Sequence, residues 1–246
     1  MPRFFIRQNQ IEDIENERIV SITGDDAHHI SRALRMAAGE TIEVCDMQKN
    51  LYTCELFSFE DTFVKARILS QVQSDTEPPH FIRLYQALAK GDKMETIIQK
   101  SIECGACEIV PFSSERCVVK LDKKDEKKKR ERWQKIAESA AKQSGRGIIP
   151  EIKSVLTFKE LLEKINGTVL FCYEGENTVT IKEALQKSKI QGDVSVIIGS
   201  EGGFSQKEAA LLREKGAISV GLGKRILRCE TAPTFALSCI CYELEL

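Results

Sequence analysis

The sequence predicts two domains: a small β-rich domain and, after it, an α/β domain built on a mostly parallel sheet. Three features of the chain predict this fold class. Residues 1–72 contain several short segments rich in β-branched and aromatic residues, residues 73–79 are polar and end in two prolines, and residues 80–246 alternate between strand-like and helix-like patterns. Because neither a helix nor a central strand accepts Pro78 and Pro79, we expect 73–79 to be a linker.

In the first domain, residues with high strand propensity fall in four segments, which are 18–23, 41–46, 52–59 and 63–72. A short helix is expected between the first two segments, because Asp25 or Asp26 can cap it. Its apolar stripe is predicted to consist of Ala27, Ile30 and Leu34, which recur at helical spacing. So many strands in so short a segment indicate a small barrel.

In the second domain, strand and helix patterns alternate. Strands are expected at 81–88, 108–112, 168–173, 194–198 and 217–221, and helices at 92–104, 125–143, 158–165, 181–186, 205–215 and 231–246. Apolar strands that alternate with helices imply a parallel sheet covered on both faces. Because ligands of such sheets bind beyond the carboxyl ends of the strands, the loops after residues 173, 198 and 221 are the predicted site.

Composition excludes several classes of protein. No stretch of the chain approaches the roughly 18–20 apolar residues of a membrane span, and its start lacks the pattern of a signal peptide, so we expect a cytoplasmic protein. The nine cysteines suggest no disulfide framework, and Cys104 and Cys107, although spaced as CxxC, have no second pair of ligands. We therefore expect reduced thiols and no metal site.

Glycine-rich segments follow three of the predicted strands, at residues 173–176, 198–204 and 221–228. Closely spaced glycines let a backbone turn sharply and approach a ligand, although they also simply close strand-to-helix turns. None of these segments matches GxGxxG or GxxxxGK[ST], so neither a dinucleotide site nor a P-loop is supported. Glu201 would repel a pyrophosphate and suits a ligand that carries positive charge, such as a sulfonium cofactor.

Basic residues concentrate between Lys123 and Lys135, where eight Lys or Arg stand against three acidic residues, although the net charge of the chain is only −1. Such a run either binds phosphate groups or forms the solvated face of a helix, and the run alone favours the solvated face. A second group of polar side chains, His28, Arg32 and Arg35, shares one face of the helix predicted in the first domain.

Several segments occur in a combination that resembles one known family. They are 3–5, 28–35, 86–95, 98–100, 114–116, 143–146, 199–204 and 222–232. The chain is similar to the bacterial enzymes that methylate N3 of a uridine in 16S ribosomal RNA, a family of the SPOUT class of methyltransferases. The resemblance implies a PUA-like RNA-binding β-barrel over 1–72 and an α/β trefoil-knot methyltransferase domain over 80–246. Two residues depart from the family's pattern, because Ser200 stands where proline is usual and Cys229 where threonine is usual.

The resemblance also implies ligands and the residues that hold them. The cofactor would be S-adenosyl-L-methionine, bound by Leu170, Tyr173, Glu174, Ile198, Gly199, Glu201, Gly202, Leu222, Gly223, Ile226 and Leu227. The substrate would be 16S ribosomal RNA in the small ribosomal subunit, contacted by Arg32, Arg35, Lys90, Lys93, Arg116, Lys128, Arg146 and Arg225, with His28 as a further contact. Proteins of this class form homodimers, and the expected interface is the apolar face of the final helix, with Ala236, Leu237, Ile240, Cys241 and Leu244. An ordinary core helix would show the same apolar face.

Two residues are candidates for catalysis. The N3–H group of uracil must lose its proton to attack a methyl group, and Arg228 would stabilise the negative charge that builds on the uracil oxygens. Glu230 would be the base, or else an acidic residue in the first turn of the final helix without a part in the chemistry. Arg146 would bind a phosphate group or the target base.

Three rival functions stay open at this point. The first is a non-catalytic protein that binds ribosomal RNA, and the second is a methyltransferase of the same class that acts on a ribose 2′-hydroxyl or on transfer RNA. The third is a nucleotide-binding metabolic enzyme, which the missing phosphate motifs disfavour. Binding of S-adenosylmethionine would separate the first rival from an enzyme, and the identity of the modified nucleoside would separate the second.

Overall fold

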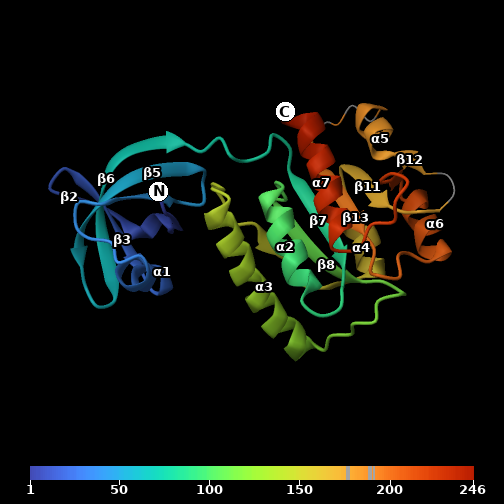
Figure 1. The fold of residues 1–246 in the computed structure, drawn as a ribbon, viewed down its shortest axis with the longest axis horizontal. Helices are drawn as coiled ribbons and strands as arrows, with labels where there is room; N and C mark the ends of the chain where they lie inside the picture. Colours follow the sequence, from blue (N-terminus) through green and yellow to red (C-terminus); the bar gives the residue numbers. More distant parts are fainter. Residues whose placement is uncertain (176–177, 188–189, 191) are drawn as a thin grey trace. The chain divides into compact units, whose positions relative to one another are not determined.

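The computed structural model describes residues 1–175, 178–187, 190 and 192–246. The chain forms two compact units (Figure 1). The first unit contains residues 1–77 together with 141–149, and the second contains 78–140 and 150–246. The division between Glu77 and Pro78 falls within the predicted linker 73–79, whereas the segment 141–149, expected in the second domain, belongs to the first unit.

The first unit is a six-stranded sheet in the order β1-β4-β5-β6-β3-β2. Its strands are β1 (Arg3–Phe5), β2 (Ile11–Ile14), β3 (Glu17–Thr23), β4 (Thr41–Cys45), β5 (Asn50–Phe59) and β6 (Phe63–Gln73). The pairing of β1 with β4 is parallel and all other neighbours are antiparallel. The residue pattern does not predict β1 and β2, which have only three and four residues.

The helical segment of the first unit differs from the prediction. It begins as α1 (Asp25–His28) and widens into the π-helical η2 (His29–Ala33), where the N–H of Leu34 bonds to the carbonyl of His29. Wider turns shift the spacing at which a side chain returns to the core, and Leu34 is accordingly 41% exposed rather than buried. The residue at the N-cap is Gly24, so neither Asp25 nor Asp26 caps the helix.

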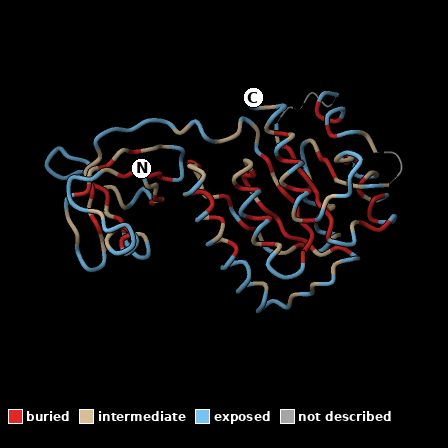
Figure 2. The backbone as a smooth tube through the Cα atoms, in the orientation of Figure 1, coloured by how far each residue is buried: buried red, intermediate tan, exposed pale blue. Residues whose placement is uncertain are grey.

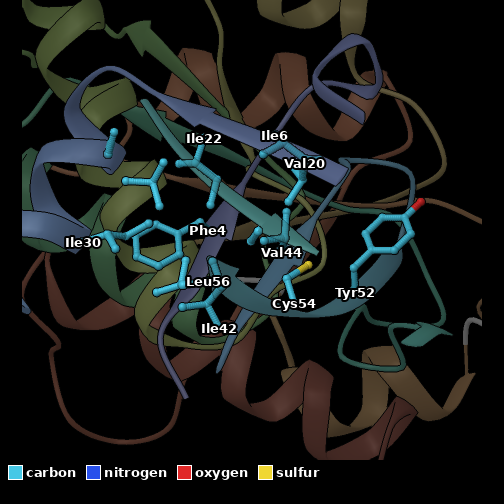
Figure 3. Packing of buried hydrophobic residues seen from close by; sticks show 13 residues of the cluster. Phe4, Ile6, Val20, Ile22, Ile30, Ile42, Val44, Tyr52, Cys54 and Leu56 are labelled. Atoms are coloured by element: carbon cyan, nitrogen blue, oxygen red, sulfur yellow. The ribbon is translucent and has the colours of Figure 1, made fainter. Parts of the chain in front are cut away.

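The core of the first unit lies between the sheet and this helical segment (Figure 3). Alternate residues of β3, β4, β5 and the first half of β6 point to it, as expected for a half-buried sheet. Phe4 of β1, Ile22 of β3 and Leu56 of β5 belong to the same cluster as Ile30 of η2. Tyr52 lies at the margin of this cluster, where its hydroxyl donates to Oδ2 of Asp46 at 3.1 Å.

The segment 141–149 is held in the first unit by charged side chains. Arg146 forms an ion pair with Glu77 in which Nη2 lies 2.6 Å from Oε2, and both side chains are only 4% exposed. Nearby, the Lys142 ammonium lies 2.6 Å from Oδ1 of Asp26, and the guanidinium of Arg3 donates to the carbonyl of Gly145. Glu77 is therefore a buried ion-pair partner rather than a residue of a free linker.

The second unit is an eight-stranded sheet in which every pairing is parallel. Its strands are β7 (Ile82–Ala87), β8 (Glu108–Ser113), β9 (Glu151–Ile152), β10 (Leu156–Thr157), β11 (Thr168–Cys172), β12 (Val179–Thr180), β13 (Val194–Ile198) and β14 (Ile218–Gly221). The main order is β10-β8-β7-β13-β11-β14-β12, and β9 pairs with β8 beside it. The predicted parallel sheet is confirmed, whereas the two-residue strands β9, β10 and β12 leave no clear trace in the residue pattern.

The helices of the second unit are α2 (Lys93–Glu103), α3 (Lys123–Gln143, whose last residues belong to the first unit), α4 (Phe158–Lys164), α5 (Ile181–Lys187), α6 (Gln206–Glu214) and α7 (Thr231–Leu244). The strands between them are the most buried part of this unit (Figure 2). In the described ranges, no helix has both the length and the apolar composition that crossing a membrane requires.

The apolar face of α7 is part of this core. Ala236, Leu237 and Ile240 are fully buried where α7 packs on α2, α5 and β13. These three residues of the expected dimer interface are therefore covered within the chain, whereas Cys241 and Leu244 are half-buried.

Candidate active site

A cavity of about 1000 Å³ lies beyond the carboxyl ends of β11, β13 and β14. These three strands are neighbours in the sheet, so the loops that follow them meet at one edge. The cavity is lined by residues 172–175 after β11, 198–204 after β13 and 220–230 after β14, with contributions from Lys93 and Arg116. Its size is in the range of small-molecule pockets. The loops singled out by their glycines thus line a single pocket.

Ten of the eleven residues expected to bind a cofactor line this cavity. They are Tyr173, Glu174, Ile198, Gly199, Glu201, Gly202, Leu222, Gly223, Ile226 and Leu227. Leu170 does not line it: this residue lies within β11, paired with Val196 and Ile218, and is 1% exposed. Leu170 therefore contributes to the sheet and not to the pocket wall.

The loop after β13 passes close to Arg116. A Cβ atom on Gly202 would lie 3.0 Å from Cβ of Arg116, so a larger residue at this position would press on the neighbouring segment. The Arg116 guanidinium donates from Nη1 to the carbonyl of Gly202 at 2.9 Å. This contact orders the loop and keeps a cationic side chain at the wall of the pocket.

Arg116 is positioned by a cluster that the sequence predicts only in part. Ser205 and Glu208 form a capping box at the start of α6. Glu208, which is 4% exposed, also accepts the backbone N–H of Glu115 at 2.8 Å, and the hydroxyl of Ser205 donates to Glu115 at 2.7 Å. The capping residues thus hold the segment 114–116 beside the loop after β13, a contact between residues far apart in sequence.

The loop after β14 turns at Gly223, whose φ of +106° lies in the left-handed region that favours glycine. Ile226 is 82% exposed at the wall of the cavity, whereas Cys229 is buried. Arg228 also lines the cavity, and within the described part of the chain its guanidinium forms no ion pair. Its charge is therefore available to a ligand.

Two carboxylates lie in the pocket with Lys93 between them. The ammonium of Lys93 is 2.9 Å from Oε1 of Glu201 and 3.9 Å from Oε2 of Glu230. Burial acts to raise the pKa of Glu201, but hydrogen bonds from Lys93 and from the N–H of Lys90 outweigh it and lower the pKa. The pKa of Glu230 is lowered mainly by its own backbone N–H, with contributions from Cys229 and Lys93. Both groups are therefore carboxylates at neutral pH.

The thiol of Cys229 is a hydrogen-bond donor to Glu230, with Sγ 3.2 Å from Oε2. Burial and the adjacent Glu230 carboxylate raise the pKa of this thiol to about 12. Cys229 thus stays protonated and serves as a hydrogen-bond donor at a position where the family resemblance predicts a threonine hydroxyl. The other departure, Ser200, is 6% exposed in the loop after β13.

Comparison with known proteins identifies the family. Residues 76–241 match the model of an RNA methyltransferase domain, and residues 22–69 match that of an RNA methyltransferase PUA domain. The chain is 38% identical over 252 aligned residues to ribosomal RNA small subunit methyltransferase E of Bacillus subtilis, covering 100% of this chain and 98% of that protein. It belongs to the ribosomal RNA small subunit methyltransferase E family.

Solved structures of methyltransferases support the same assignment. The methyltransferase E of Neisseria gonorrhoeae bound to S-adenosyl methionine is 31% identical, with a TM-score of 0.86 over 98% of this chain and 97% of that one. A putative methyltransferase of Legionella pneumophila in complex with the cofactor SAM is 30% identical, with a TM-score of 0.86 over 98% and 96% of the two chains. The methyltransferase domain described above is thus the second unit, and the PUA domain lies in the first.

The cations expected to bind RNA have different surroundings in this methyltransferase. Arg32 and Arg35 are exposed in the PUA domain, and Lys90, Arg116, Lys128 and Arg225 are exposed in the methyltransferase domain. Arg146 is different, because its guanidinium is buried and bonded to Glu77. Its expected role as an RNA ligand is corrected to a structural one. Lys93 has two carboxylates of the pocket, Glu201 and Glu230, as partners, so its ammonium is not free for a phosphate group.

One pocket residue has a support that no local pattern predicts. The ring of Tyr173 lies beside Phe171, and the guanidinium of Arg213 from α6 lies 5.5 Å from its centroid. A Cβ atom on Gly175 would come within 2.0 Å of Cε1 of Tyr173, so the chain folds back over the ring at this glycine. Arg213 and Gly175 therefore fix the loop after β11 in this family member.

The cysteines form no structural cross-link among the described residues, and all nine have free thiols. Cys104 is the C-cap residue of α2, and Cys107 directly precedes β8. Within the same described residues, no group of three His, Cys, Asp or Glu side chains is arranged to hold a metal ion.

Proposed function

We propose that the pocket binds S-adenosylmethionine and that this protein methylates N3 of a specific uridine in 16S ribosomal RNA of the small ribosomal subunit. The observation that carries the proposal is the convergence of three glycine-rich loops on one cavity at the carboxyl ends of β11, β13 and β14. A protein that acts on ribosomal RNA meets its substrate in the cytoplasm, which is where we place this enzyme.

The residues around the cavity fit this cofactor. Ile198, Leu222 and Leu227 supply apolar surface for an adenine ring, and the backbone of the surrounding loops supplies hydrogen-bonding groups. Glu174 and Glu201 are acidic residues of the wall that favour a ligand with a sulfonium and an ammonium group. When bound, S-adenosylmethionine supplies an electrophilic methyl group on its sulfonium.

The chain's own residues would then prepare the uracil. Arg228 lines the cavity, is exposed and forms no ion pair within the described residues, so its guanidinium can stabilise the negative charge on the uracil oxygens. Glu230 lies two residues away and is ionised, so it can accept the N3 proton. The electron pair left on N3 forms the new bond to carbon while the carbon–sulfur bond breaks.

RNA binding would use the exposed cations of both units. Arg32 and Arg35 lie on the surface of the PUA domain, while Lys128 is one of the exposed basic residues of α3. Phosphate contacts of this kind position an RNA without reading its sequence. We therefore expect these cations to contribute to the affinity for the small-subunit RNA. This affinity should depend strongly on salt concentration.

We also propose a homodimer, but through a different face of α7 from the one first expected. Phe235 and Tyr242 are 37% and 72% exposed, and their spacing of two helical turns puts them on the same side of α7. Leu246 follows them and is 97% exposed. A second copy would cover this apolar stripe, and Tyr242→Glu is expected to yield a monomer in sedimentation measurements.

Small ribosomal subunits from a strain that lacks this gene provide the direct test. Incubation with the protein and methyl-labelled S-adenosylmethionine is expected to give N3-methyluridine at one site, identified by mass spectrometry of the nucleosides. Arg228→Ala should abolish most of the product, whereas Lys159→Ala, an exposed residue on α4, should not reduce it. A different methylated nucleoside would reject the proposed target. If the protein neither transfers methyl groups nor binds the cofactor, a non-catalytic RNA-binding protein would be the better-supported function.

A further inference from the structure

A continuous set of polar contacts joins the loop after β13 to the start of α7. Oε1 of Glu201 accepts the backbone N–H of Lys90 at 3.1 Å and the ammonium of Lys93 at 2.9 Å. The same ammonium lies 3.9 Å from Oε2 of Glu230, which also accepts the thiol of Cys229 at 3.2 Å. A single lysine at the first residue of α2 is therefore shared by two carboxylates from two different loops.

Stability does not explain this arrangement. The side chains of Lys93, Glu201 and Glu230 are 36%, 34% and 22% exposed. Ion pairs with this degree of exposure contribute little to the free energy of folding, because water and salt screen them. All three side chains line the cavity, so we attribute the cluster to the ligand that the cavity binds.

Two carboxylates held close together without a cation repel each other, and one of them then binds a proton more readily. The groups that face this cluster are Glu201 from the loop after β13, Cys229, Glu230 and Arg228 from the loop before α7, and Lys93 from α2. The hydrogen bond to Glu201 raises the pKa of Lys93, so its ammonium is charged across the neutral range.

We propose that Lys93 is a positioning residue for Glu230. Its ammonium bridges Glu230 and Glu201, the carboxylate on the cofactor side of the pocket, and so holds Glu230 at the end of the pocket where the methyl group is accepted. With the ammonium present, both carboxylates stay ionised at neutral pH. The inference rests on the proposed function, in which an O–H bond forms on Glu230 as the N3–H bond of uracil breaks. Lys93 itself touches no reacting atom.

The test compares two substitutions of Lys93 with a control on the same helix. Lys93→Met removes the charge, Lys93→Arg keeps it, and Lys100→Gln removes a lysine of α2 whose ion pair among the described residues is with Glu103. For Lys93→Met we expect kcat at neutral pH to fall roughly tenfold to a hundredfold, a part of the roughly 10²–10⁴-fold that a well-placed general base contributes. Cofactor affinity, measured by calorimetry without RNA, should change much less than kcat.

The pH profile gives the readout that a merely structural role would not move. In Lys93→Met the acid limb of kcat should shift to higher pH, because the pKa of Glu201 or Glu230 rises when their shared cation is lost. Lys93→Arg should restore most of the activity and the original limb, and Lys100→Gln should match the unsubstituted protein. An unchanged acid limb and unchanged kcat in Lys93→Met would overturn the proposal. Equal losses in Lys93→Met and Lys93→Arg, with cofactor binding also lost, would overturn it as well.

A second measurement does not depend on turnover. Carbon-labelled glutamate carboxylates can be titrated by NMR and assigned with Glu201→Gln and Glu230→Gln. The proposal predicts that Lys93→Met raises the pKa of at least one of these carboxylates, and unchanged values would contradict it. If the unsubstituted protein methylates no ribosomal RNA, the proposed function fails, and this titration still decides whether Lys93 keeps the carboxylates ionised.

Discussion

The two units hold ionic clusters of opposite kinds. In the PUA-containing unit, Glu77 bonds through both carboxylate oxygens to Arg146 and through Oε1 to the N–H of Gly147, and the charged pair is 4% exposed. In the methyltransferase unit, Lys93 and Glu201 are about a third exposed and face a cavity. The first cluster is complete without a ligand. The second cluster lies at the wall of the cavity, where a ligand can contact its charged side chains.

This difference separates structural from functional charge. A buried ion pair costs desolvation energy and is favourable only when its polar atoms are satisfied, so removing one member leaves an uncompensated charge. A partly exposed cluster contributes little to folding, so its removal should alter chemistry more than stability. Substitutions in the first cluster are thus expected to change the free energy of unfolding, and substitutions in the second to change kcat.

The largest effect on stability is expected for Glu77→Ala. Because Arg146 would remain buried without its partner, the free energy of unfolding should fall by about 3–5 kcal/mol. Urea unfolding followed by circular dichroism measures the change. As a control, Glu151→Ala removes an exposed partner of Lys153 and should cost less than about 1 kcal/mol. Equal, small losses in the two variants would show that the buried pair is not the anchor of the segment 141–149.

The largest effect on chemistry is expected for Arg228→Ala. Loss of a charged donor at the developing negative charge lowers kcat by roughly a hundredfold to a thousandfold in comparable sites. Because the side chain makes no ion pair in the described part of the chain, the midpoint of thermal unfolding should stay unchanged. Methyl transfer under saturating substrate measures kcat. A variant that keeps full turnover would remove Arg228 from the mechanism.

An intermediate effect is expected for Gly175→Ala. The added Cβ would meet the ring of Tyr173 at 2.0 Å and would force either the ring or the loop after β11 to move. We expect the affinity for S-adenosylmethionine to weaken roughly tenfold, the size of one lost contact in a preformed pocket. Calorimetry measures this affinity. Unchanged binding would mean that this loop does not contact the cofactor.

The smallest effect is expected for Asp46→Asn in the first unit. Burial acts to raise the pKa of Asp46, but hydrogen bonds from Asn50, Gln48 and Gln8 outweigh it and hold the pKa below its ordinary value of 3.8. A carboxyl with a lowered pKa stabilises the fold above that value and loses its contribution as the pH falls through the lowered one. We expect Asp46→Asn to cost about 1 kcal/mol at neutral pH and nothing in strong acid. A stability difference between Asp46→Asn and the unsubstituted protein that grows toward low pH would contradict a lowered pKa for Asp46.

The position of the site was predictable from sequence for a physical reason. In a parallel sheet the carboxyl ends of all strands lie along the same edge, so the loops after β11, β13 and β14 were confined to that edge by the alternation of strands and helices alone. That these three strands are adjacent follows from the sheet order, which residue patterns do not specify. The knotted path of the chain stays a prediction from the family resemblance.

The remaining errors come from contacts between distant residues. Arg146 has the same charge as Arg228, and only its pairing with Glu77, 69 residues earlier, makes it structural. Leu34 fits a helical stripe, but the π-helical turn before it moves its side chain into solvent. The apolar residues of α7 predict a buried face without saying whether a second chain or the same chain covers it. Local spacing carries no information on any of these partners.

The central claim is that the cavity beyond β11, β13 and β14 is the binding site for S-adenosylmethionine. A crystal structure of the protein grown with this cofactor tests it most directly. We predict density for the cofactor against Ile198, Leu222 and Leu227, with its sulfonium facing the side of the pocket that holds Arg228 and Glu230. Density at another place on the chain, or an empty cavity under conditions where calorimetry detects binding, would contradict the claim.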